Sequence, residues 1–269
     1  MKFYGLFGEK LTHSLSPQLH KEIYKRAGIN AAYKTFPFPP DQLHQAVNSL
    51  KILSISGTNV TIPYKKAVMP FLDKIDPVAQ KLGVVNTIAN KDGKLTGYNT
   101  DYDGFDLLFK RRSWSVQDKD VTVLGTGGSS QMVVAYLKDH GARSITLVSR
   151  SVKEAVEDER LRYLTYEDSA EISGHFLINT TPVGMYPNAD SCPVDPAVIS
   201  RFDALIDLIY NPMETVFLKE ARERGKPGVN GLEMLIGQAV RAAEIWEDQT
   251  FPEELTDSLI KDYEQWKGA

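Results

Sequence analysis

Hydrophobic residues in this chain form short apolar runs, and amphipathic stretches separate most of these runs. Alternation of this kind predicts parallel strands connected by helices, which is an α/β architecture. The first run, Lys2–Gly8, predicts a strand. Ser16 and Pro17 predict the start of a helix, because serine can cap a helix and proline fits its first turn. We expect this helix to end near Gly28 and to bury Leu19, Ile23 and Tyr24.

The same alternation continues along the chain. Further strands are predicted at residues 31–38, 54–60, 84–90, 94–99, 121–124, 144–148, 176–178 and 204–209. Further helices are predicted at residues 41–51, 64–73, 214–225 and 231–246, and from the glycine-rich stretch after residue 124 through Leu137. Lys91-Asp92-Gly93 is a strong hairpin signal between two of the strands. The polar segment 111–120 separates two parts of the chain that differ in their sequence pattern, so a domain boundary is predicted near residues 103–119.

Composition narrows the class of protein. The chain has 269 residues, 42% hydrophobic and 25% charged, which suits either two compact globular lobes or one large α/β unit. The net charge of −4 disfavours nucleic-acid binding. Cys192 is the sole cysteine, which leaves no intrachain disulfide, and no metal-ligand set is visible. No apolar stretch reaches the roughly 18 residues of a membrane span and the start is unlike a signal peptide, so we expect a cytoplasmic protein without a membrane partner.

A glycine-rich turn follows the apolar run 121–124 and precedes a predicted helix. Strand, glycine-rich turn, helix and strand are the context of a dinucleotide-binding site. Gly125 permits the tight turn, and Gly127 removes a side chain where the backbone must approach a pyrophosphate. The third position is Ser130, which is still small enough for close packing. The free N–H groups at the helix start can bind phosphate.

The next predicted strand ends at Ser149, and Arg150 follows it. An NAD site usually has an acidic residue here, which binds the ribose 2′-hydroxyl. A guanidinium instead suits a 2′-phosphate, because it can pair with the phosphate bidentately. With Arg150 present, Lys153 close behind and no acid, NADP is favoured over NAD; the alternative is that Arg150 is an ordinary surface arginine.

Polar clusters in the first hundred residues lie at predicted strand ends, where open α/β sheets bind ligands. These clusters are 13–17, 59–65, 86–87 and 99–101. Their serine, threonine and asparagine side chains suit a polyhydroxylated substrate. Lys65 and Asp101 form the clear acid/base pair among them. Each residue also has a structural interpretation: Ser14 and Ser16 can cap a helix, Lys65 can face solvent, and 99–101 can be a turn that caps a helix at Asp103.

Taken together, the motifs of this chain resemble the shikimate dehydrogenase family over nearly the whole length. The matching stretches are HSLSP (13–17), GTNVTIPYK (57–65), VVNT (84–87), GYNTD (97–101), GTGG (125–128), NTTPVGM (179–185), DLIYNP (207–212) and NGLEMLIGQA (230–239). The resemblance implies NADP-linked, reversible reduction of 3-dehydroshikimate to shikimate in aromatic amino-acid biosynthesis. It also implies a substrate-binding domain at 1–103, a Rossmann-type NADP-binding domain at 104–230, and C-terminal helices at 231–269 that pack back on the first domain.

Residue roles follow from the same resemblance. Lys65 would give and take the proton, and Asp101 would orient it. The residues implied to bind the substrate are Ser14, Ser16, Thr61, Asn86, Asp101, Tyr210 and Gln238. The residues implied to bind the cofactor are Gly125, Gly127, Gly128, Ser149, Arg150, Met185 and Gly231.

Two other functions remain open. Ser149-Arg150-Ser151 replaces the family's usual Asn-Arg-Thr, which leaves an NAD-preferring quinate/shikimate dehydrogenase as the nearer alternative. A non-catalytic metabolite sensor is the other, since a fold does not fix a function. The intact Lys65 and Asp101 favour an enzyme over a sensor. We expect a monomer or a homodimer.

Overall fold

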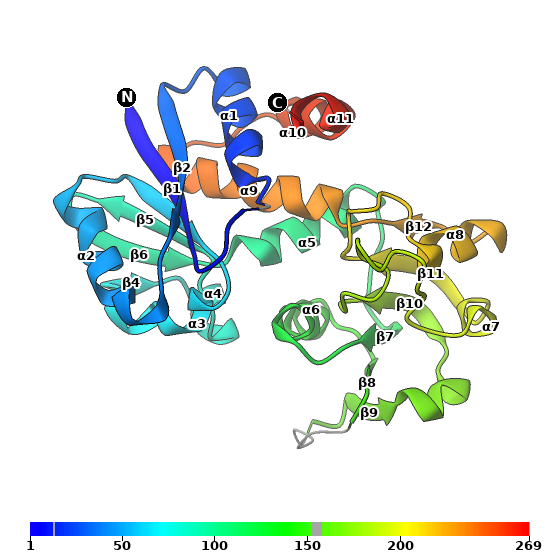
Figure 1. The fold of residues 1–269 in the computed structure, drawn as a ribbon. Helices are drawn as coiled ribbons and strands as arrows, with labels where there is room; N and C mark the ends of the chain where they lie inside the picture. The colour runs from blue at the N-terminus through cyan, green and yellow to red at the C-terminus, as the bar shows by residue number, and fades with distance from the viewer. Residues whose placement is uncertain (13, 152–157, 269) are drawn as a thin grey trace. The chain divides into compact units, whose positions relative to one another are not determined.

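The computed structural model describes residues 1–12, 14–151 and 158–268, and in it the chain forms two units (Figure 1). The first unit comprises residues 1–104 and 235–269, and the second comprises residues 105–234. The chain passes from the first unit to the second within helix α5 (Thr100–Lys110) and returns within helix α9 (Leu232–Glu247).

The first unit is built on a six-stranded sheet in the order β2-β1-β3-β5-β6-β4. Its strands are β1 (Lys2–Gly8), β2 (Ala31–Pro37), β3 (Gly57–Val60), β4 (Lys74–Ile75), β5 (Thr87–Lys91) and β6 (Lys94–Tyr98). Its other helices are α1 (Ser16–Ala27), α2 (Leu43–Ile52), α3 (Tyr64–Ala67), α4 (Pro77–Leu82), α10 (Glu253–Lys261) and α11 (Tyr263–Trp266), with short 3-10 helices at η1 (Pro40–Gln42) and η2 (Met69–Phe71). Strand β5 is antiparallel to β3 and β6, whereas the other pairs are parallel, so the predicted mostly parallel sheet is confirmed.

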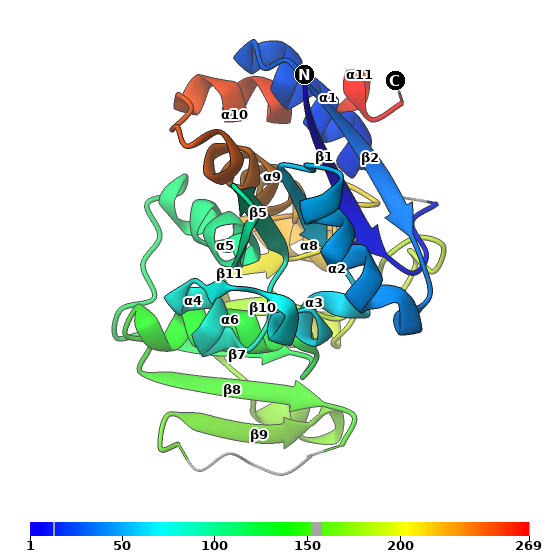
Figure 2. The ribbon, with the colours of Figure 1, turned by 90° about the vertical axis from the view of Figure 1, so that its left-hand side faces the viewer.

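Helices cover both faces of this sheet (Figures 1 and 2). On one face, α2 and α3 pack on the strands through an apolar cluster that includes Leu50, Tyr64 and Ile88. On the other face, Trp246 of α9 stacks on Tyr4 with 4.5 Å between ring centroids. Helices α10 and α11 contact α1. The core of the first unit therefore lies in two apolar layers, one on each face of the sheet.

The second unit has an entirely parallel sheet in the order β12-β11-β10-β7-β8-β9. Its strands are β7 (Asp120–Leu124), β8 (Ser144–Ser149), β9 (Leu161–Thr165), β10 (Gly174–Asn179), β11 (Phe202–Asp207) and β12 (Gly228–Val229). Its helices are α6 (Gly128–Asp139), α7 (Pro196–Ile199), α8 (Val216–Glu223) and the 3-10 helix η3 (Tyr166–Glu171). Counted from β7, the strand order is 6-5-4-1-2-3, which is the doubly wound Rossmann order.

Both faces of the second sheet are also covered. Figure 1 shows α6 on one face and α7 and α8 on the other. Phe202 and Phe217 lie in the apolar cluster under α7 and α8, and both are fully buried. On the α6 side, Tyr136 packs edge-on against Phe105 of α5.

Most of the predicted elements are confirmed, with informative exceptions. Asp92 and Gly93 both have positive φ, as the predicted hairpin requires. The predicted helix 64–73 is instead two short pieces, α3 and η2. Helix α5 begins at Thr100 rather than at Asp103. Ser16 is not the cap of α1, because Leu15 occupies that position without a side-chain hydrogen bond.

Candidate active site

The polar clusters of the first unit meet at one edge of its sheet because β5 runs against its neighbours. Thr87 at the start of β5 pairs with Asn59 near the end of β3 and with Tyr98 at the end of β6. The beginning of β5 and the ends of β3 and β6 therefore lie together. Asn86, just before β5, and Thr100, just after β6, meet there.

Lys65 and Asp101 form an ion pair at this edge. The Lys65 Nζ atom lies 2.5 Å from Asp101 Oδ2. Lys65 lies in α3 and Asp101 in the first turn of α5. The two side chains are 30% and 23% exposed, so the pair is partly desolvated but remains open to solvent and ligands. A lysine and an aspartate in this arrangement can exchange a proton with a bound molecule.

Asn86 is held rigidly beside this pair. Its side chain is 3% exposed, and its Oδ1 atom accepts a hydrogen bond of 2.7 Å from the Thr100 backbone N–H. Its Nδ2 group donates to Thr100 Oγ1 at 3.1 Å. A primary amide has two N–H donors, and the contact with Thr100 uses one of the two.

The other residues predicted to bind substrate are divided between the two units. Ser14 Oγ accepts a hydrogen bond from the Ser16 N–H, and the two hydroxyls are 3.2 Å apart. Thr61 and Gln238 are half-buried in the first unit, and the Gln238 amide donates to the Leu235 carbonyl. Tyr210 is also half-buried but belongs to the second unit. His13 of the HSLSP motif is outside the described residues.

The glycine-rich turn of the second unit lies at the end of β7, next to β10. This is the point where the strand order reverses, which is where doubly wound sheets bind ligands. Gly125 has a φ of +105°, and an added Cβ would lie 2.9 Å from Thr180 Oγ1. A Cβ on Gly127 or Gly128 would meet nothing within 4 Å. The backbone is therefore open here to an incoming ligand.

Helix α6 begins at this turn without a side-chain cap. Its first N–H groups are therefore free of the carboxylate or hydroxyl that often occupies such a position. Ser130, in the first turn, is 1% exposed, and its hydroxyl has no hydrogen-bond partner among the described residues. Open glycine backbone next to an uncapped helix start fits the pyrophosphate of a dinucleotide.

The residues expected at the adenosine phosphate follow β8. The Ser149 hydroxyl donates to the Ser151 carbonyl at 2.7 Å, which bends the chain so that Arg150 lies at the turn and is exposed. The neighbouring strand β9 is in register, with Ser149 opposite Thr165. Lys153 lies outside the described residues.

A buried network at the same edge of the second sheet was not predicted from the sequence. Asp207 is fully buried at the end of β11 and accepts from Asn179 Nδ2 at 3.0 Å and from Thr215 Oγ1 at 2.6 Å. Burial raises the pKa of Asp207 to about 6, although these hydrogen bonds oppose the shift. The signal in the sequence was an aspartate directly after an apolar run.

Met185 and Gly231 were predicted to border the cofactor. Met185 is 45% exposed, so its side chain is accessible to a ligand. Gly231 is buried, and a Cβ there would collide with the backbone of Leu208. The chain can pass this point only with glycine.

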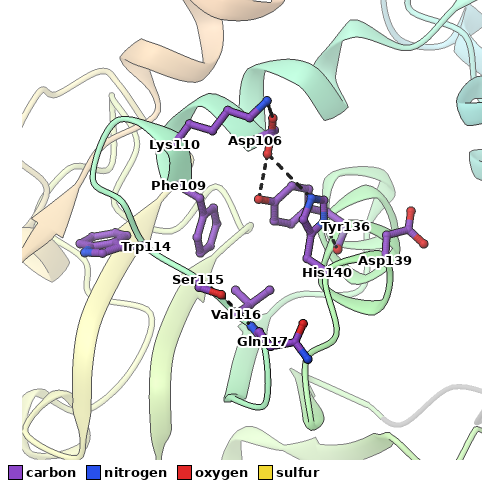
Figure 3. Close-up of a pocket in the computed structure, with 10 residues that line it drawn as sticks. All are labelled: Asp106, Phe109, Lys110, Trp114, Ser115, Val116, Gln117, Tyr136, Asp139 and His140. Carbon is purple, nitrogen blue, oxygen red and sulfur yellow. Dashed lines mark hydrogen bonds and ion pairs between the residues drawn. The ribbon is translucent and has the colours of Figure 1, made fainter.

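A pocket of about 440 Å³ lies elsewhere in the second unit, between α5, the loop after it and the end of α6 (Figure 3). Figure 3 shows the Tyr136 phenol, which donates to Asp106, and the His140 ring beside it. Its lining residues are Asp106, Phe109, Lys110, Trp114, Ser115, Val116, Gln117, Tyr136, Asp139 and His140. This pocket lies near the start of β7, at the opposite end of that strand from the glycine-rich turn, so it is separate from the predicted cofactor site.

Two further properties bear on the class of protein. Among the described residues, no group of three or more His, Cys, Asp or Glu side chains could hold a metal ion. In the same part of the chain, no helix is both long enough and apolar enough to cross a membrane.

The fold and the two sites define a two-domain α/β protein with a Rossmann-type dinucleotide unit and a lysine–aspartate pair on the other unit. Residues 6–88 match the family model "Shikimate dehydrogenase substrate binding domain". The chain is 48% identical over 266 residues to "Shikimate dehydrogenase (NADP(+))" of Clostridium beijerinckii, covering 98% of both chains. The chain belongs to the shikimate dehydrogenase family.

The chain is also similar to solved structures of shikimate dehydrogenases. The crystal structure of shikimate dehydrogenase 1 from Peptoclostridium difficile superposes with a TM-score of 0.88 at 41% identity, covering 98% of both chains. A shikimate dehydrogenase in complex with NADP+ superposes with a TM-score of 0.87 at 35% identity, covering 98% of this chain and 96% of that one. The predicted family and the predicted two-lobed α/β fold are confirmed.

Proposed function

We propose that this protein is a shikimate dehydrogenase, which reversibly reduces 3-dehydroshikimate to shikimate with NADPH. Its relative from Clostridium beijerinckii is named for the NADP(+)-linked activity. The observation that carries the chemistry is the 2.5 Å contact between Lys65 and Asp101. Reduction of a ketone requires a group that delivers a proton to its oxygen, and this pair supplies one.

Lys65 is the proton donor and acceptor. Negative charge builds on the ketone oxygen during reduction, and the Lys65 ammonium neutralises it and delivers the proton. Because its side chain is 30% exposed, Lys65 can then recover a proton from solvent. Asp101 holds the ammonium in one orientation by accepting its hydrogen bond. In the reverse direction, neutral Lys65 takes the proton from the substrate hydroxyl.

The other polar residues of the first unit bind the substrate. The hydroxyls of Ser14 and Ser16, which lie 3.2 Å apart, donate to the substrate carboxylate. This carboxylate is remote from the reacting carbon, so its contacts supply positioning energy. The residues assigned to the ring hydroxyls are Thr61, Asn86, Asp101 and Gln238, and Tyr210 is assigned to the substrate as well.

NADP binds the second unit. When bound, it supplies or accepts the hydride. Gly125, Gly127 and Gly128 hold the pyrophosphate, since the backbone at Gly127 and Gly128 is open and α6 is uncapped. Ser149 and Arg150 lie at the 2′-phosphate, and Met185 and Gly231 border the nicotinamide.

Domain roles follow from these assignments. Residues 1–103 with the C-terminal helices 231–269 form the substrate-binding part, and residues 104–230 bind NADP. With one cysteine and hence no intrachain disulfide, the enzyme suits the reducing cytoplasm. It acts as a monomer or a homodimer, which light scattering of the purified chain distinguishes.

The test is nicotinamide absorbance with the purified chain, shikimate or quinate, and NADP or NAD at matched concentrations. Fastest turnover with shikimate and NADP is expected. Faster turnover with NAD would contradict the assignment of Arg150 but leave the Lys65–Asp101 chemistry standing. Binding of shikimate without turnover of any pair would instead indicate a sensor.

A further inference from the structure

A continuous chain of hydrogen bonds runs through the first unit and ends beside the Lys65–Asp101 pair. The Tyr33 phenol donates to Asn59 Oδ1 at 2.8 Å. Asn59 Nδ2 donates to Thr87 Oγ1 at 3.0 Å, and Thr87 Oγ1 donates to Asn86 Oδ1 at 3.0 Å. Each group thus donates to the next, so the bonds polarise one another in one direction.

The residues of this hydrogen-bond network are buried, so each of their hydrogen bonds matters for the stability of the fold. Asn59 is 6% exposed, and Thr87 and Thr100 are fully buried. A buried polar group costs free energy when it loses its partner, so each member must keep its bond. Valine has nearly the shape of threonine and would suit a buried strand position such as that of Thr87. The hydroxyl at Thr87 therefore serves the network rather than the packing of the sheet.

The network fixes the backbone that carries the ion pair. Asn86 Oδ1 accepts from the N–H of Thr100, which is the first residue of α5 and is followed directly by Asp101. The N–H of Val85, the neighbour of Asn86, donates to the Lys65 carbonyl at 2.8 Å. Residues 85 and 86 therefore hold the backbone of both partners of the pair.

At its other end the network reaches the predicted carboxylate site. The Tyr33 ring stacks on His20 with 4.2 Å between centroids, which fixes the direction of the phenol. Burial raises the pKa of the Tyr33 phenol, and a hydrogen bond with the Ser16 hydroxyl opposes this shift. Tyr33 thus lies between Ser16 and Asn59.

We infer that Tyr33, Asn59 and Thr87 are positioning residues, which set the distance and orientation of Lys65 and Asp101 through Asn86 and Thr100. They act without touching the reacting atoms. The inference rests on the proposed function, because positioning for turnover has meaning only where the pair transfers a proton.

The experiment compares Thr87→Val and Tyr33→Phe, which each remove one hydroxyl from the network, with Thr87→Ser, which restores it. Thr58→Val is the matched control. Thr58 is also fully buried and lies beside Asn59 in β3, but its side chain points to the opposite face. Among the described residues, its hydroxyl bonds only to the Asn59 carbonyl. We expect Thr87→Val and Tyr33→Phe to lower kcat about 10- to 100-fold, with KM for shikimate within about threefold of the unchanged enzyme. Thr87→Ser and Thr58→Val should keep most of kcat.

A second measurement does not depend on turnover. Lysines are labelled by reductive methylation with 13C-formaldehyde, and the Lys65 signal is assigned by its loss in Lys65→Ala. We expect this signal to shift in Thr87→Val but not in Thr58→Val. The inference is overturned if the Lys65 signal is unmoved and kcat stays within threefold in both hydroxyl-deleting variants, or if Thr58→Val loses as much as Thr87→Val. Failure of the unchanged enzyme to turn over shikimate would contradict the proposed function instead, while the signal would still test the network.

Discussion

The Lys65 Nζ atom lies 2.5 Å from Asp101 Oδ2, although 36 residues separate the two along the chain. The contact exists because α3 follows β3 and α5 follows β6, and the antiparallel strand β5 between them brings both helix starts to one edge. Neither side chain is fully buried, so the pair can meet a ligand without unfolding.

Replacing Lys65 with alanine removes the proposed proton donor. We expect Lys65→Ala to lower kcat by about 10²- to 10⁴-fold, the usual contribution of a general acid, with shikimate affinity changed only a few-fold. Steady-state kinetics and calorimetric binding measure the two effects separately. Lys66→Ala is the control, because Lys66 is the next residue and is exposed. A Lys65→Ala enzyme that turned over at the normal rate would remove Lys65 from the mechanism.

Asp101→Asn tests the orienting partner. Asparagine keeps the shape of aspartate but loses the charge that holds the Lys65 ammonium, so we expect kcat to fall by about 10- to 10³-fold. Asp103→Asn is the matched control, because Asp103 lies in the same helix and pairs with Arg241 at 3.7 Å. Equal kinetic effects of the two variants would mean that loss of any negative charge from α5 lowers kcat, and would contradict a specific role for Asp101.

How much of this fold the sequence predicts depends on the length of each element. The hairpin at Asp92 and Gly93 is local, so its turn residues suffice to predict it. Strands β4 and β12 have only two residues each and form because a neighbouring strand pairs with them. No local pattern marks a strand of that kind, and both were missed.

Contacts between distant segments also limit how much of the candidate active site the sequence predicts. Lys65 and Asp101 could be selected by residue type, but their contact follows from the antiparallel direction of β5, which links distant segments. The hydrogen-bond network of the first unit was not predicted, because Asn59 and Thr87 look like ordinary polar residues at the ends of strands. Their burial, 6% and 0% exposed, is a tertiary property.

Arg150→Ala tests the cofactor phosphate. A charge-assisted hydrogen bond contributes about 1.5–3 kcal/mol, so we expect KM for NADPH to rise about 10- to 100-fold. KM for NADH, which has no 2′-phosphate, should change little. Arg143→Ala is the control, because Arg143 precedes the same strand β8 that Arg150 follows and pairs with Asp120. Parallel increases for both cofactors would show that Arg150 does not read the phosphate.

Gly57→Ala tests the contact between β3 and α9. An added Cβ would collide with the Trp246 indole nitrogen and lie 2.8 Å from the Ile88 carbonyl, which accepts the indole N–H at 2.9 Å. Overpacking of this kind lowers the free energy of unfolding by about 1–3 kcal/mol. Urea unfolding measures it. Gly128→Ala is the control, since a Cβ there meets nothing within 4 Å, and it should not destabilise. A stable Gly57→Ala protein would mean that α9 shifts without cost.

His20 gives the fold a dependence on pH. It is fully buried, and burial lowers its pKa to about 3 from the ordinary 6.5. As the pH falls, the folded state therefore keeps His20 neutral while the unfolded chain takes up a proton. The contribution of His20 to the free energy of unfolding is fully present above pH 6.5 and is lost as the pH falls towards 3. Between pH 7.5 and 5, this one group should cost about 2 kcal/mol.

The measurement is the free energy of unfolding at both pH values for the unchanged protein and for His20→Phe, which keeps a ring against Tyr33. Buried Asp207, whose pKa is raised to about 6, works in the opposite sense, because its contribution is lost as the pH rises through 6. Only the difference between the two proteins therefore isolates His20. We expect the loss on acidification to be about 2 kcal/mol smaller in His20→Phe. His44→Phe, at an exposed position of α2, should keep the full loss. Identical pH dependence in all three proteins would mean that His20 is protonated as readily in the fold as in the unfolded chain.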